Sequence, residues 1–195
     1  MDTLQLTVPL VRQILATAFA HVWTLHGFGM LRLPLPDNVR LHIWDDRYRV
    51  PNVSMIHDHL QWGFESLVVS GHIINHRYAE NNSGKGKPYE VMVIKPGADA
   101  YAKSEPKTML LEETEIEFLP AGMTYSQAPS EIHRSEAANG TVTLMQRYLT
   151  DDDSARVFWE AGTNWVDAKP RVATYSEVND IVSTALGWFP NKGTK

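Results

Sequence analysis

The chain has 195 residues and a formal net charge of −5, with 43% hydrophobic and 21% charged residues. This composition is that of an ordinary globular protein, and the length predicts that residues 1–195 form one domain with its own core. The absence of cysteine excludes disulfides, a thiol nucleophile and thiolate metal sites, so histidine and carboxylate remain as the strong metal ligands.

The same features limit the partners and the compartment. The acidic balance argues against nucleic-acid binding. The sequence contains no apolar run of 18 residues and lacks the basic start of a signal peptide. We therefore expect a cytoplasmic protein that spans no membrane and acts on a small-molecule substrate. The tryptophan-rich C-terminal part offers an interface for a homodimer.

The N-terminal part predicts a helix over residues 8–26. Pro9 lies in its first turn, and Gly27 follows its last residue. Apolar residues recur at helical spacing and form one stripe: Leu10 or Val11, Ile14, Leu15, Ala18, Phe19, Val22 and Trp23. We expect His21 and His26, which lie on this helix, to be structural or surface residues.

The middle of the chain changes to short runs of β-forming residues bounded by Gly, Pro, Asn and Asp, from about residue 39 to residue 149. Ten such runs in about a hundred residues predict an all-β antiparallel barrel or sandwich. The predicted strands are Val39–Trp44, Val53–His59, Glu65–Ser70, His72–Tyr78, Tyr89–Ile94, Ala100–Lys103, Met109–Leu111, Glu115–Leu119, Glu131–Ser135 and Thr141–Leu149.

A C-terminal extension follows the barrel and contains a second predicted helix, over residues 176–187. Ser176 is the predicted cap and Gly187 the stop. One apolar face is expected to pack on the outside of the barrel: Val178, Ile181, Val182 and Leu186.

The stretch around His57 and His59 carries the predicted chemistry. Two histidines separated by one residue lie on the same face of a strand, so both imidazoles can reach one metal ion. Glu65 opens the next predicted strand, and a hairpin could bring its carboxylate over the pair. A tight site needs a further ligand, and His133, beside a late strand, is the best candidate.

The spacing of these residues resembles the cupin superfamily. His57, His59, Glu65 and Gly71 are similar to the first cupin motif, and Glu117-Phe-Leu-Pro-Ala-Gly122 is similar to the opening of the second. Where cupins commonly place the third histidine, three residues after that glycine, this chain has Tyr125. A histidine arrives only at His133, in an Ile-His-Arg context similar to that of the third iron ligand in the cysteine dioxygenase branch.

The resemblance implies a jelly-roll (double-stranded β-helix) barrel of the cupin type, flanked by the N- and C-terminal helices. It further implies a mononuclear site with His57, His59 and His133 as ligands and Glu65 as an optional fourth. Fe(II) is the implied metal, with Mn, Ni or Zn as alternatives. The implied activity is that of a small-molecule oxygenase similar to the thiol dioxygenases. A metal-dependent isomerase or lyase acting on a sugar or keto acid, and a non-enzymatic binder, remain as alternatives.

Further site residues follow from strand alternation. Thr143, Met145 and Arg147 share one face of a late strand, so Arg147 either faces the pocket and holds a substrate carboxylate or forms a salt bridge at the rim. Tyr125 is expected to orient the substrate or else to be an aromatic residue at the barrel mouth. His42 could also point into the pocket, but we favour a position in the core or at the surface.

Overall fold

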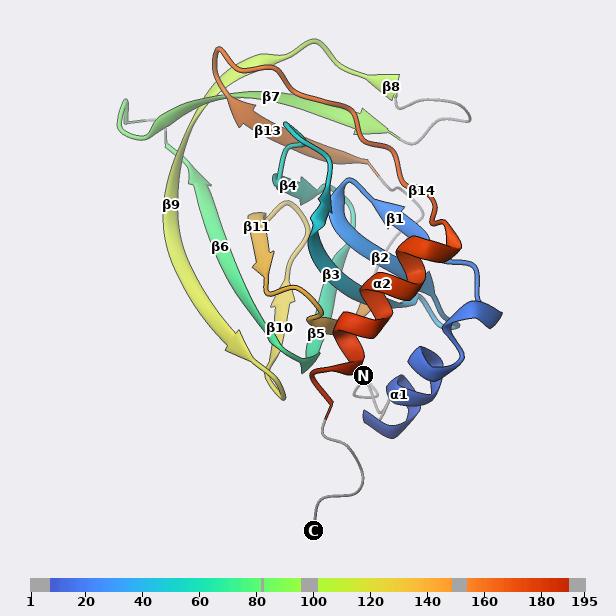
Figure 1. The fold of residues 1–195 in the computed structure, drawn as a ribbon. Helices are drawn as coiled ribbons and strands as arrows, with labels where there is room; N and C mark the ends of the chain where they lie inside the picture. Colours follow the sequence, from blue (N-terminus) through green and yellow to red (C-terminus); the bar gives the residue numbers. More distant parts are fainter. Residues whose placement is uncertain (1–7, 82, 96–101, 149–153, 190–195) are drawn as a thin grey trace.

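The computed structural model describes residues 8–81, 83–95, 102–148 and 154–189 and contains two antiparallel sheets of seven strands (Figure 1). The first sheet has the order β10 (Thr124–Gln127), β5 (Gly63–Ser70), β12 (Val142–Tyr148), β3 (Val39–Arg49), β2 (Phe28–Pro34), β1 (Thr24–His26) and β14 (Arg171–Val172). The second has the order β13 (Ala155–Glu160), β4 (Ile56–His59), β11 (Ile132–Ala137), β6 (His72–Glu80), β9 (Lys107–Pro120), β7 (Lys87–Lys95) and β8 (Ala102–Lys103).

The second sheet closes on itself. Strand β13 pairs with β4 on one side and with β7 on the other, so β13, β4, β11, β6, β9 and β7 form a closed antiparallel barrel. Closure pairs the backbone groups that would otherwise be exposed at the two outer strands of an open sheet. This architecture confirms the predicted all-β barrel with flanking helices.

Both helices lie near the outer face of the first sheet (Figure 1), namely α1 (Val8–Ala16) and α2 (Tyr175–Leu186). Their buried residues join one core with the outward residues of β1, β2, β3, β5 and β12. Helix α2 begins with a capping box, in which Thr174 and Glu177 each accept a hydrogen bond from the other's backbone N–H. The predicted cap at Ser176 was therefore two residues too late, whereas the predicted end at Gly187 is confirmed. Among the helices of the described chain, none has the length and apolarity needed to cross a membrane.

The predicted helix over residues 8–26 was too long. Helix α1 ends at Ala16, a short 3₁₀ turn covers Ala18–Ala20, and β1 begins at Thr24. The indole N–H of Trp23 donates to the carbonyl of Ala18 at 2.9 Å, and Trp23 is buried in the same core as Leu25. Trp23 and Leu25 are separated by one residue and both are buried, which is the pattern of a strand. The helical spacing of the apolar residues before them hides this pattern in the sequence.

The sheets extend beyond the predicted limits of residues 39–149. Strands β1 and β2 precede them and β13 follows them, while β9 is one long strand where two were predicted. Gly29, which follows the predicted helix by three residues, has a φ of 76° and lies at a register shift between β2 and β3. It allows a bulge in a strand rather than ending a helix. Leu149, the predicted end of the barrel, lies outside the described residues.

The space between the sheets positions the site. Inward residues of the first sheet, β10 included, and of β6 and β9 form a second core. Its members are Met30, Trp44, Trp62, Phe64, Val68, Ile73, Leu119, Tyr125 and Met145. Beside this core lies a cavity of about 450 Å³ that reaches from β2 and β3 to β4 and β11. This size lies within the range usual for small-molecule sites.

Candidate metal centre

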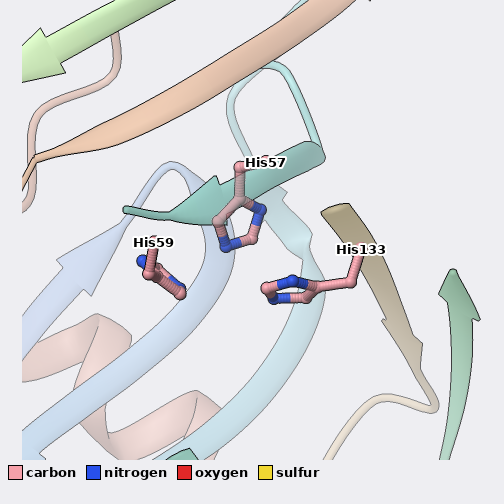
Figure 2. Close-up of side chains that lie close together, drawn as sticks. All are labelled: His57, His59 and His133. Atoms are coloured by element: carbon pink, nitrogen blue, oxygen red, sulfur yellow. The ribbon is translucent and has the colours of Figure 1, made fainter. Parts of the chain in front are cut away.

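Three histidines converge on this cavity from two neighbouring strands (Figure 2). In β4 the side chains alternate, so Ile56 packs into a separate core while His57 and His59 line the cavity. Strand β11 pairs with β4, and His133 lies directly opposite His57 in the register. The strand pairing therefore brings together three imidazoles that are up to 76 positions apart in the sequence.

The geometry of the three residues fits one metal ion. Their ligand nitrogens all lie within 4.8 Å of one another. Among the described residues, no other group of three or more His, Asp or Glu side chains meets this distance criterion. A zinc or iron ion about 2.1 Å from each nitrogen would draw the nitrogens to roughly 3 to 3.5 Å apart.

Backbone carbonyls select the nitrogen that each ring offers. The Nδ1 atom of His57 lies 3.0 Å from the carbonyl oxygen of Met55, and Nδ1 of His133 lies 2.9 Å from that of Glu131. A neutral imidazole that donates from Nδ1 keeps its lone pair on Nε2, so both rings present Nε2 to the cavity. The same arrangement orients histidines in metal sites generally.

Burial keeps these histidines neutral. It lowers the pKa of His133 to about 3, and it is also the main cause that lowers the pKa of His57 and His59. For His59 the neighbouring imidazoles and the positive charges of Arg40 and Arg147 lower the pKa further. At neutral pH no proton has to leave these rings before they bind a cation.

Aromatic residues surround the histidines. The indole of Trp62 stacks on the ring of His59 with centroids 3.6 Å apart, and Phe64 lies 5.8 Å from the ring of His133. Both residues are buried. They restrict ring rotation of the histidines and keep water from this side of the site.

Glu65 is not brought to the histidines. Along β5, Phe64 and Val68 face the inner core, whereas Leu67, which shares its face with Glu65, packs against the core under the helices. Glu65 neither belongs to the histidine group nor lines the cavity. The hairpin was expected to carry this carboxylate over the histidine pair, but it turns the carboxylate away. Glu65 and Phe64 are neighbours in β5, so their side chains point to opposite faces of the sheet.

Tyr125 lines the cavity and is buried. Its ring contacts Phe64 at 5.9 Å, and its hydroxyl is hydrogen-bonded to Ser66 and Ser135. Burial raises the pKa of Tyr125 above its usual value, so the hydroxyl stays protonated. It is therefore a neutral hydroxyl on the cavity wall.

Arg147 lies near the histidines without lining the cavity itself. Its guanidinium carbon is 4.9 Å from the centre of the Trp62 ring, and Met145, on the same face of β12, belongs to the inner core. The face of β12 that carries Met145 thus points inward, a direction that the alternation in the sequence had left open. Arg147 therefore lies against the same indole that stacks on His59.

The opposite wall of the cavity was not predicted from the sequence. His26, Arg32, Arg40 and His42 all line it, although His26 was expected on a helix and His42 in the core or at the surface. The signal was present in the alternating sequence Arg40-Leu-His42-Ile-Trp44, where Leu41 and Ile43 pack outward into the helix-covered core. The alternation of side chains along a strand shows which residues share a face, but not which of the two faces encloses a cavity.

No protein-family model and no curated protein matches the chain. The fold and the site together define a β-barrel protein with a buried three-histidine group that could bind a metal ion. This class rests on the structure itself.

The buried imidazoles predict acid sensitivity of the metal-free protein. Burial lowers the pKa of His26 to about 3, whereas an unfolded histidine titrates near its model value of 6.5. Between these values the unfolded chain takes up a proton that the folded chain refuses, so stability is fully present above pH 6.5 and falls as the pH drops. By pH 5 the loss due to His26 is about 2 kcal/mol, measurable by urea unfolding at pH 7 and pH 5.

A matched pair of variants assigns this effect. We expect His26→Gln to reduce the loss between pH 7 and pH 5, and His21→Gln, which removes an exposed imidazole, to leave it unchanged. Equal pH dependence in the wild type and His26→Gln would contradict the assignment.

Proposed function

We propose that the protein is a metal-dependent small-molecule oxygenase of the cupin type, with Fe(II) held by His57, His59 and His133. The observation that carries the proposal is the convergence of three neutral imidazoles on one buried cavity. Three such ligands occupy one side of a metal ion. When bound, iron held in this way supplies open coordination positions at which a substrate and O₂ can meet.

The fold supports the cupin assignment. Two antiparallel sheets enclose the cavity, and the histidine pair and the third histidine lie on adjacent strands of one sheet. The aromatic residue at Tyr125 and the late histidine at His133 are similar to the arrangement of the thiol dioxygenases. Glu65 points away from the site, which favours a site of three histidines over one with a fourth carboxylate ligand.

The residues of the cavity wall have distinct roles in this proposal. Trp62 and Phe64 exclude water from the histidines, since both are buried against them. The protonated hydroxyl of Tyr125 donates a hydrogen bond to the bound substrate in exchange for its serine partners. Arg147 holds Trp62 in place through its position over the indole ring.

The test begins with metal content. We expect protein purified without chelators, or reconstituted with Fe(II) under anaerobic conditions, to contain one metal ion per chain by elemental analysis. Nitric oxide, an analogue of O₂, should bind the iron-loaded protein and give the electron paramagnetic resonance signal of a high-spin iron–nitrosyl. An oxygen electrode should then record O₂ uptake with members of a panel of small thiols.

Each result separates the alternatives. Protein that binds a metal but gives no nitrosyl signal would contradict the oxygenase and point to a metal acting as a Lewis acid, as in an isomerase or lyase. Protein that binds no metal in any preparation would contradict all the metal-dependent functions.

A further inference from the structure

The wall opposite the metal centre carries a cluster of nitrogen-rich side chains. Arg32 of β2 pairs with His42 of β3 in the register, and Arg40 precedes His42 by two residues on the same face. Side chains on one face of adjacent strands lie about 5 to 7 Å apart. Arg32, Arg40 and His42 therefore form one patch of hydrogen-bond donors that faces the cavity.

His42 has an unused nitrogen in this patch. The residue is 6% exposed and its Nε2 atom is buried, yet this atom has no hydrogen-bond partner in the structure. A buried polar atom without a partner is rare in folded proteins, because it has lost its water without replacement. An unpaired ring nitrogen on a cavity wall indicates a position where a ligand completes the hydrogen bonding.

Each of the two arginines has a contact along the first sheet that restrains its side chain. The Nε atom of Arg32 donates to the hydroxyl of Thr24 at 3.3 Å, which restrains the guanidinium. The guanidinium carbon of Arg40 lies 5.8 Å from the centre of the Trp62 ring, and Trp62 stacks on His59. The patch thus begins beside the metal centre and extends away from it along the first sheet.

We propose that Arg32, Arg40 and His42 bind a tetrahedral, doubly charged oxyanion of the substrate, such as a phosphate monoester or a phosphonate. A planar carboxylate is satisfied by a single bidentate guanidinium. Two guanidinium groups and an imidazole nitrogen offer donors for three oxygens, which a tetrahedral oxyanion has. The inference rests on the proposed function only in placing the reacting part of that substrate at the three histidines.

Three probes of similar length separate charge from shape. Ethyl phosphate is tetrahedral and doubly charged at about pH 8, because the second pKa of a phosphate monoester is about 6. Ethyl sulfate has the same shape with one charge, and butyrate is planar with one charge. By isothermal titration calorimetry on the metal-loaded protein, we expect ethyl phosphate to bind at least roughly tenfold more tightly than either, as charge-assisted hydrogen bonds allow.

Variants locate the binding. Arg32→Gln and Arg40→Gln should each weaken ethyl phosphate binding roughly tenfold or more, since each removes charge-assisted donors. Arg49→Gln is the matched control, because Arg49 lies on the same strand as Arg40 but is exposed and outside this cavity. It should bind ethyl phosphate as the wild type does.

A further variant separates this inference from the function itself. His133→Ala lacks a metal ligand, so ethyl phosphate that still binds to it, and still depends on Arg32 and Arg40, supports the subsite even if the oxygenase proposal fails. Equal binding of the three probes, a preference for butyrate, absence of ethyl phosphate binding, or binding unaffected by both arginine substitutions would overturn the inference.

Discussion

Replacing His133 with alanine should abolish stoichiometric metal binding. The imidazole of His133 lies opposite His57 in the strand register, and its Nδ1 is already committed to the carbonyl of Glu131. No carboxylate among the described residues lies with the three histidines to replace it. Loss of the ligand should therefore weaken binding by more than the roughly 10- to 100-fold that loss of a hydrogen-bond partner of a ligand costs. Elemental analysis after gel filtration measures the outcome.

The matched control is another histidine of the second sheet. His76 lies on β6 and is bound to Glu113 at 2.6 Å, away from the cavity, so His76→Ala should retain one metal ion per chain. Equal metal content in His133→Ala and the wild type would show that the metal is held elsewhere. His57→Ala should behave as His133→Ala does, which provides a second variant should one of them fold poorly.

Replacing Asp58 with alanine should lower the free energy of unfolding by about 3 kcal/mol. Asp58 lies between the two histidines of β4 and is 0% exposed. Its carboxylate accepts hydrogen bonds from Nε of Arg156 at 2.7 Å and from the backbone N–H of the same residue at 2.9 Å. Removal leaves the Arg156 charge partly buried, with Glu80 as a remaining partner, so the cost falls at the lower end of the range for broken buried pairs.

An exposed ion pair provides the comparison for this effect. Lys87 and Glu160 join β7 to β13, and more than half of each side chain is exposed. Glu160→Gln should change stability by less than about 1 kcal/mol, because water and salt screen such pairs. Urea unfolding of the two variants measures how much each substitution lowers the free energy of unfolding. A similar loss in both would show that burial does not determine how much Asp58 contributes to stability. Asp58→Ala should also weaken metal binding, since the pair fixes β4 against β13.

Much of the fold could be predicted from local signals. The short runs of β-forming residues identified most of the strands, and the capping and glycine signals placed α2 within two residues of its observed start. The N-terminal part could not be predicted in this way, since the apolar stripe that suggested one helix over residues 8–26 is divided between α1 and β1. Whether Trp23 and Leu25 continue a helix or start a strand depends on their burial against residues distant in the sequence.

The sequence by itself determined the chemical character of the candidate site. Without cysteine the ligands had to be histidine or carboxylate, and the spacing of His57 and His59 put both on one face of a strand. Only the tertiary structure decided which groups meet. Pairing of β4 with β11 brings His133 to the pair, and the orientation of β5 turns Glu65 away. The tertiary structure also places the side chains of Arg32, Arg40 and His42 at the cavity. The physical reason is that alternation fixes which residues share a face, whereas the packing of one sheet on another fixes which face is enclosed.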